Sequence, residues 1–101
     1  MTQTNTTQPT AAKAFPLGQI VATPGALAAF ERNGQQPIEF LHRHAAGDWG
    51  EVCEEDKRAN DHAVENGARI LSAYTLTDGT KVWVVTEADR ASTAMLLPEE
   101  Y

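Results

Sequence analysis

The order of local signals along the chain predicts an α+β fold, with two to three N-terminal helices packed on a C-terminal three-stranded antiparallel meander. Helix signals occupy residues 23–67, and strand-like runs separated by turn signals follow in residues 69–97. The chain has 101 residues, which is close to the commonest size of one domain. We therefore expect a single α+β domain over residues 15–101, preceded by a tail.

Residues 1–14 form the expected tail. After Met1 this stretch consists mainly of Thr, Gln, Asn and Ala and has no large apolar side chain. Such a segment buries too little surface to offset the backbone entropy of folding, so we expect it to be disordered. The apolar run from Phe15 to Ala22 then predicts an extended segment or a short edge strand, because Pro16 lacks an N–H donor.

The first helix has both a start and a stop signal. Thr23 is a preferred capping residue, Pro24 suits the first helical position, and Asn33-Gly34 is typical of a helix end. Leu27 and Phe30 are three residues apart, so we expect both on the buried face.

Two more helices are predicted after the first. Residues 37–46 carry an apolar stripe that includes Ile38 and Leu41. Residues 54–66 begin with three carboxylates, which the helix dipole favours in a first turn, and Gly67 follows as a C-terminal cap. The chain therefore supplies a helical hairpin and a third helix before the strands begin.

Asp78-Gly79 lies between two β-type runs and is a strong hairpin signal. If these two residues form the turn, Tyr74 faces Trp83 on one side of the hairpin. Ala73 then faces Val84 on the other side, which has small apolar residues and is expected to receive the helices.

A third strand is expected over residues 92–97, after a loop of residues 87–91. As the last strand of a meander it would leave one edge unpaired. That edge is where we expect two copies to meet if the protein is a homodimer rather than a monomer.

The charge of the chain limits its partners. The net charge is −6, and residues 1–37 hold only Lys13, Glu31 and Arg32, so residues 38–101 carry −7. An acidic domain repels the nucleic-acid backbone, so we expect no direct nucleic-acid binding. A protein partner with a basic surface fits better, with simple solubility as the alternative reading of the charge.

The compartment is expected to be the cytoplasm. No apolar run approaches the roughly 18 residues of a membrane span, and the first residues lack the basic start and apolar core of a secretory signal. The single cysteine, Cys53, has no internal partner for a disulfide, which suits a reducing compartment.

The residues with the strongest catalytic potential are His42, His44, Asp48 and Arg90. A histidine near an acid could act as a general acid or base, and Arg90 could hold an anion. The two histidines are two residues apart and do not share a helix face, so we expect no metal site and no cofactor. We treat these four as weak candidates and assign no catalytic residue.

Binding residues are expected to be acidic or aromatic. Trp49 lies between two glycines, either as a core plug or as an exposed anchor for a partner. The full set of candidates is Trp49, Glu51, Glu54, Glu55, Asp56, Tyr74, Trp83, Glu87, Asp89, Arg90, Glu99 and Glu100.

These motifs together resemble a family of small bacterial proteins borne on plasmids, prophages and integrative elements, usually called plasmid-related or hypothetical proteins. The resemblance covers residues 15–101 and is carried by Leu41-His42-Arg43-His44, Gly47-Asp48-Trp49-Gly50, Glu55-Asp56, Asn60, Asn66-Gly67, Arg69-Ile70-Leu71-Ser72-Ala73-Tyr74, Trp83-Val84-Val85-Thr86-Glu87-Ala88-Asp89-Arg90 and Leu96-Leu97-Pro98-Glu99-Glu100-Tyr101.

The resemblance implies an accessory protein of a mobile element in a bacterial cytoplasm, and it brings no known reaction. Some members are labelled as restriction–modification methylase subunits. This chain has no methylase motif and is too short for that activity.

Three functions remain open at this point. The first is a non-enzymatic acidic protein that binds a protein partner, for example to inhibit a host defence nuclease or a nucleic-acid-binding complex. The second is a small RNase-type toxin that uses His42 or His44 with Arg90. The third is a structural or regulatory dimer.

Overall fold

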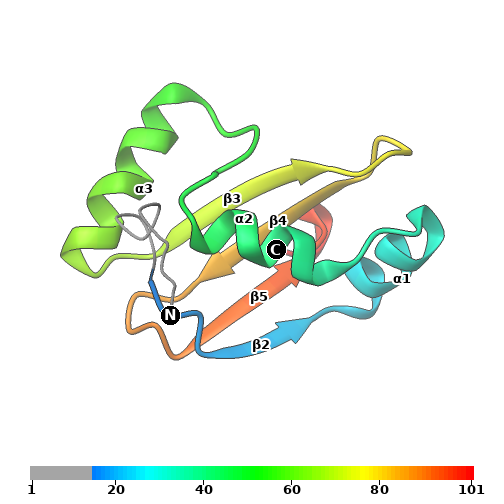
Figure 1. Cartoon of the computed structure of the whole chain (residues 1–101), viewed down its shortest axis with the longest axis horizontal. Helices are drawn as coiled ribbons and strands as arrows, with labels where there is room; N and C mark the ends of the chain where they lie inside the picture. The colour runs from blue at the N-terminus through cyan, green and yellow to red at the C-terminus, as the bar shows by residue number, and fades with distance from the viewer. Residues whose placement is uncertain (1–14) are drawn as a thin grey trace, which may run out of the picture.

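A four-stranded mixed sheet carries α2 across one face, with α3 beside one edge and α1 at the far end (Figure 1). The computed structural model of the chain describes residues 15–101, so the tail expected over residues 1–14 lies outside the described part. In chain order the elements are β2 (Gln19–Ala22), α1 (Pro24–Asn33), α2 (Pro37–Ala45), α3 (Glu54–Asn66), β3 (Ile70–Thr75), β4 (Lys81–Thr86), β5 (Ser92–Leu96) and the 3-10 helix η2 (Pro98–Glu100).

The sheet has one strand more than the predicted meander. Strands β3, β4 and β5 are antiparallel neighbours, as expected, and the α+β class is confirmed. Strand β2 adds to β5 in parallel, with Val21 opposite Ala94, and gives the order β2-β5-β4-β3. The edge of β5 that was predicted to be open is therefore paired, and β2 is the edge strand instead.

The predicted register of the hairpin is wrong by one residue. The loop has three central residues, because Leu76 N–H donates to the Thr80 carbonyl and Gly79 N–H donates to the Leu76 carbonyl. Gly79 has a φ of 91°, so the loop is a turn followed by a left-handed glycine. The aspartate–glycine signal located the hairpin correctly but did not fix the loop length.

The corrected register separates the two aromatic residues that were predicted to face each other. Tyr74 lies opposite Val82 on the face that the helices cover, and Trp83 lies opposite Ala73 on the other face. Tyr74 is 1% exposed, whereas Trp83 is half-buried. For β3 the helices therefore pack on the side that was predicted to face away from them, whereas Val84 of β4 lies on the helix-covered face, as predicted.

The helix boundaries agree with the sequence signals. Thr23 Oγ1 accepts from the Ala26 N–H at 3.1 Å, and Gly34, with a φ of 62°, caps the C-terminal end of α1. The predicted faces are less accurate, because Leu27 is 49% and Ile38 is 54% exposed.

One hydrophobic core lies between the sheet and the first two helices. Phe30 contacts Phe40 with ring centroids 5.6 Å apart, and Phe40 contacts Tyr74 at 5.3 Å. Met95 and Val84 complete this cluster from the sheet. A second, smaller cluster unites Phe15, Trp49, Ala63 and Ile70 under α3.

Candidate functional site

His44 lies at the centre of a buried chain of hydroxyl groups. Helix α2 directs its fully buried ring toward the sheet, where Nδ1 is 2.5 Å from Ser72 Oγ and Nε2 is 2.9 Å from Thr86 Oγ1. Thr86 is 2.7 Å from the Thr93 hydroxyl, which donates to the Leu17 carbonyl at 2.7 Å. The chain links α2, three strands and the segment before β2.

The donor and acceptor of each hydrogen bond in this row of hydroxyl groups follow from its end at the Leu17 carbonyl. The Leu17 carbonyl can only accept, so the Thr93 hydroxyl donates its one proton to that carbonyl. Thr93 must then accept a hydrogen bond from the Thr86 hydroxyl. The Thr86 hydroxyl then accepts from His44 Nε2–H, and Nδ1 accepts from Ser72. We therefore assign His44 the neutral Nε2–H tautomer from the network.

Burial holds His44 in its neutral form. Desolvation lowers the pKa of His44 from 6.5 to about 4. Both ring nitrogens are bonded within the core, so neither is free to exchange a proton with a substrate at neutral pH. The role that this geometry supports is structural. His42, two residues earlier, is exposed on the opposite side of α2.

Phe15 joins three of the candidates in one buried cluster. Its ring lies 5.2 Å from the His44 ring and 6.1 Å from the Trp49 ring, and the Arg90 guanidinium lies 5.6 Å from its centroid. His44 and Trp49 also contact edge to face at 5.9 Å. Because Phe15 is 9% exposed and occupies the centre, these side chains form core packing.

Trp49 and Tyr74 are core residues in this structure. Trp49 is 4% exposed, and its Nε1–H donates to Asp61 Oδ1 at 3.1 Å. The Tyr74 hydroxyl donates to the Asp48 carbonyl at 2.6 Å, and burial raises the pKa of Tyr74 to about 12. Neither side chain presents the exposed aromatic surface that the sequence analysis assigned to partner binding.

Asp48 pairs with a cation and not with histidine. Arg43 Nε donates to Asp48 Oδ2 at 2.8 Å, and this hydrogen bond holds the pKa of Asp48 below its usual value. The same guanidinium lies 4.6 Å from the Tyr74 ring centroid. An acid–base pair of His44 with Asp48 is therefore not present.

Arg90 stabilises the end of α3. It has a positive φ of 59°, unusual for a residue other than glycine, and its guanidinium donates to the carbonyls of Ala63 and Ala68, both at 2.7 Å, and of Glu87 at 3.1 Å. A cation that bonds the last carbonyls of a helix complements the helix dipole. Arg90 is thus committed to main-chain carbonyls and is not placed to hold an external anion.

The acidic candidates do not form one surface. Glu51, Glu54, Glu55 and Asp56 gather at the start of α3, whereas Glu87 and Asp89 lie in the loop whose Arg90 reaches the end of α3. At 1.5 Å per residue, the 13-residue helix separates these two places by about 18 Å. Glu99 and Glu100 form a third place in η2, where Glu100 Oε1 accepts from the Thr23 hydroxyl.

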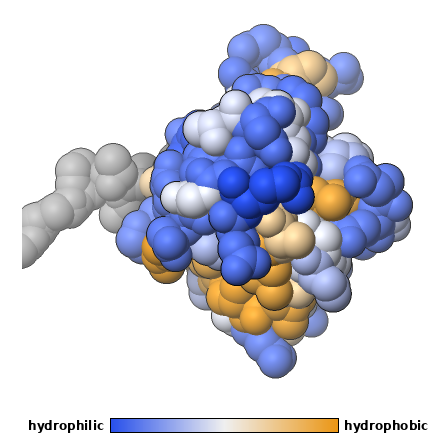
Figure 2. All heavy atoms as spheres, turned by 90° about the vertical axis from the view of Figure 1, so that its right-hand side faces the viewer, coloured by the Kyte–Doolittle hydropathy of each residue, from blue (hydrophilic) through white to orange (hydrophobic). Residues whose placement is uncertain are grey.

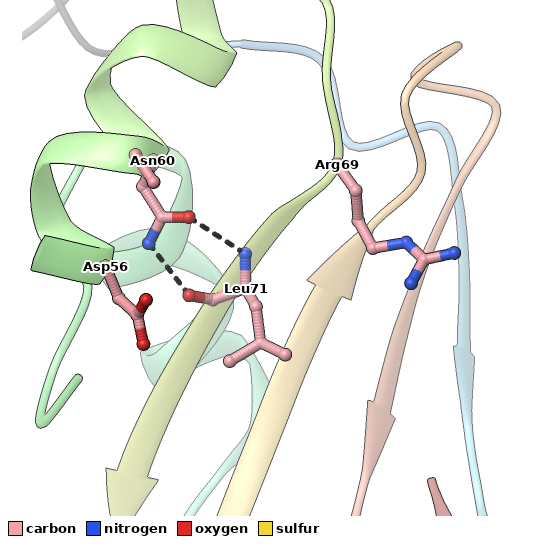
Figure 3. A pocket seen from close by; sticks show the side chains of 5 residues that line it. Asp56, Asn60, Arg69 and Leu71 are labelled. Atoms are coloured by element: carbon pink, nitrogen blue, oxygen red, sulfur yellow. Dashed lines mark hydrogen bonds between the residues drawn. The ribbon is translucent and has the colours of Figure 1, made fainter. Parts of the chain in front are cut away.

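A surface pocket of about 200 Å³ lies between α3 and β3, lined by Asp56, Ala59, Asn60, Arg69 and Leu71 (Figure 3). Asn60 closes its inner side, because its amide donates to the Leu71 carbonyl at 2.8 Å and accepts from the Leu71 N–H at 3.2 Å. The Arg69 side chain extends away from Asp56 and donates to the Tyr101 hydroxyl at 2.6 Å. The carboxylate and the guanidinium are therefore not joined across the pocket.

The sequence analysis named Asn60, Ser72 and Thr86 only within the resembling motifs, gave them no role, and did not single out Thr93. Asn60 shares the inward face of α3 with Ala63, three residues later, and one polar residue on an apolar face is a usable signal. Ser72 and Thr86 occupy inward strand positions, but the incorrect hairpin register hid their alignment with His44.

Within residues 15–101, no group of three or more His, Cys, Asp or Glu side chains is arranged to hold a metal ion. The helices of that same stretch lack the length and apolar character that crossing a bilayer requires. Comparison with protein-family models, curated proteins and solved structures finds no match to the chain.

Proposed function

We propose that this chain is a non-enzymatic binding protein that uses the acidic start of α3 to bind a protein with a basic surface. The proposed surface consists of Glu51, Glu54, Glu55 and Asp56, and we name it the α3 acidic surface. The observation that carries the proposal is the exposure of all four carboxylates, three in the first turn of α3 and Glu51 three residues before it.

The surface retains negative charge at neutral pH. Glu51 accepts hydrogen bonds from Thr75 and Lys81, which hold its pKa below the usual value. Glu54 has one exposed ion pair, with Lys57 at 3.4 Å. An exposed pair of this kind is weak, so a basic partner competes for these carboxylates at little cost.

Charge at this surface favours fast association with a basic partner. Over its 13 residues, α3 carries five acidic and two basic side chains, so it contributes half of the net charge of −6. Complementary potentials raise association rates and select against acidic competitors. A nucleic-acid-binding protein is the partner class with the matching basic groove, and inhibition of a host defence nuclease encoded against mobile elements is the narrower form of the proposal.

The RNase-type alternative has less support. It needs a histidine that exchanges protons and an arginine that holds phosphate, whereas His44 and Arg90 are both bonded to other groups of the fold. His42 remains exposed, but the described contacts bring no second catalytic group to it.

The test compares two double variants that remove the same charge. Glu55→Gln with Asp56→Asn neutralises the α3 acidic surface, and Glu31→Gln with Glu39→Gln neutralises two exposed carboxylates on α1 and α2. Each tagged protein is incubated with bacterial lysate at low salt, and the retained proteins are identified by mass spectrometry.

We expect the wild type and the control to retain the same basic nucleic-acid-binding protein, and the α3 variant to lose it. Retention of no basic protein at low salt, or equal retention by both double variants, contradicts the proposal.

A further inference from the structure

The two edges of the sheet are built differently. Along β3, the edge facing α3 is closed by side-chain and main-chain groups. The Asn60 side chain hydrogen-bonds both main-chain groups of Leu71. The Ala73 N–H donates to the Trp49 carbonyl at 3.1 Å, and the Ala73 carbonyl accepts from the Glu51 N–H at 2.7 Å. Natural sheets close edges in such ways to prevent unplanned strand pairing.

The edge at β2 is open within residues 15–101. Gln19 N–H donates to the Ala91 carbonyl at 2.9 Å and Thr23 N–H to the Met95 carbonyl at 3.0 Å, both toward β5. In a parallel pair alternate residues bond the same neighbour, so the main-chain groups of Ile20 and Ala22 point away from the sheet. No described strand lies on that side.

The β2 edge also lacks the residues that normally protect an edge. Gln19-Ile20-Val21-Ala22 contains no charge and no proline, and Ile20 and Val21 are 42% and 46% exposed. The adjoining first turns of α1 add Leu27, which is 49% exposed. Figure 2 shows hydrophobic residues gathered over the lower part of this end of the molecule, beneath a hydrophilic band.

We propose that two copies of the chain pair antiparallel through β2 and join their sheets into one. A two-fold axis beside Val21 places Ile20 opposite Ala22 of the other copy. These are the residues whose main-chain groups point outward, so each pair exchanges two hydrogen bonds, about four in all. The two Val21 side chains then meet at the axis, on the sheet face that the helices leave uncovered.

A second copy suits this edge because the two-fold arrangement pairs the outward main-chain groups of both strands, and because the strip itself carries no charge. Two chains that each carry −6 repel one another over most of their surfaces, and the uncharged β2 strip is a place where they approach without opposing carboxylates. Helix α3 packs against β3, at the opposite edge of the sheet, so pairing through β2 leaves both α3 acidic surfaces exposed. The inference therefore stands independently of the proposed function.

Sedimentation equilibrium of the full chain tests the pairing directly. We expect the wild type to convert from monomer to dimer as its concentration rises toward about 1 mM, the weak range appropriate to a short strand contact. Val21→Lys places two ammonium groups at the axis and should raise the dissociation constant at least about tenfold. Ile38→Lys is the matched control, since Ile38 is also a β-branched apolar residue and is 54% exposed but lies on α2, and this variant should dimerise like the wild type.

Two further readouts keep the test decisive if a variant folds poorly. Val21→Lys mixed with Val21→Glu should restore a dimer that neither forms alone. In the wild type, the Ile20 and Ala22 amides should gain hydrogen-exchange protection with concentration, while the Gln19 amide, already bonded to Ala91, should not change. A strict monomer at about 1 mM, or a dimer that Val21→Lys leaves intact, overturns the proposal.

Discussion

Acidification from pH 7 to pH 4 should destabilise the fold through His44. Folding lowers the pKa of this histidine from 6.5 to about 4 because the ring is buried. At about 1.4 kcal/mol per pKa unit, this difference lowers the free energy of unfolding by about 3 kcal/mol. A domain of this size has a total stability on the order of 5–10 kcal/mol, so the loss is a large fraction of it.

The sign follows from proton uptake. Below pH 6.5 the unfolded chain protonates His44 while the folded chain does not, so the free energy of unfolding falls as the pH drops. The fall ends near pH 4, where the folded state also takes up the proton. The carboxyls of Asp48 and Glu51 have lowered pKa values, so their stabilisation is lost as the pH falls further through those values.

Urea unfolding followed by tryptophan fluorescence between pH 7 and pH 4 measures this effect. His44→Gln should be less stable than the wild type at pH 7 and should lose most of the pH dependence between 6.5 and 4. His42→Gln, which changes an exposed side chain on the same helix, should keep the wild-type pH dependence. A wild-type stability that is constant over this range, or a His44→Gln variant with the full slope, would refute the reasoning.

Two further predictions concern the backbone. Arg90→Ala should lower the free energy of unfolding by about 1–3 kcal/mol, because it removes the hydrogen bonds to the Ala63 and Ala68 carbonyls. Arg90→Gly should lower it by about 1 kcal/mol less, because glycine tolerates the φ of 59°, and equal losses in urea unfolding would contradict this. Gly50 and Gly67 have similar positive φ values, but a Cβ on Gly50 would overlap the Ala73 carbonyl, whereas a Cβ on Gly67 meets nothing within 4 Å. In thermal unfolding, Gly50→Ala should therefore cost at least about 2 kcal/mol more than Gly67→Ala, and a smaller loss at Gly50 would show that its loop moves freely.

Helix boundaries were predictable because their signals are local. Thr23 with Pro24, Gly34 and Gly67 each act within one turn of the chain, and the structure confirms the ends that they indicated. The faces were less predictable, because whether Leu27 or Ala26 is buried depends on how α1 meets the sheet. That information is not contained in the spacing of apolar residues alone.

Long-range pairings were not predictable from local signals. The parallel contact of β2 with β5 joins Val21 to Ala94 across more than seventy residues, and nothing in either segment specifies the other. The hairpin error had the same origin on a smaller scale. Asp78-Gly79 is compatible with two-residue and three-residue loops, and the choice between them shifts β3 by one residue against β4, which decides which residues of the two strands share a face.

The prediction of the candidate site was limited both by the uncertain helix faces and by the unpredicted strand pairings. Residue types alone marked His44, Trp49 and Arg90 as candidates, and the structure does bring them together around Phe15. Their chemistry is nevertheless decided by burial and by hydrogen-bond partners such as Ser72, which depend on the strand register.

The salt dependence of partner binding tests the central claim most directly. The affinity of the full chain for the basic protein that it retains is measured over a range of salt concentrations, for the wild type and for the two double variants. We predict steep weakening with salt for the wild type and for Glu31→Gln with Glu39→Gln, and a shallower dependence with weaker binding for Glu55→Gln with Asp56→Asn. An affinity that does not change with salt, or the same dependence in all three proteins, would contradict binding through the α3 acidic surface.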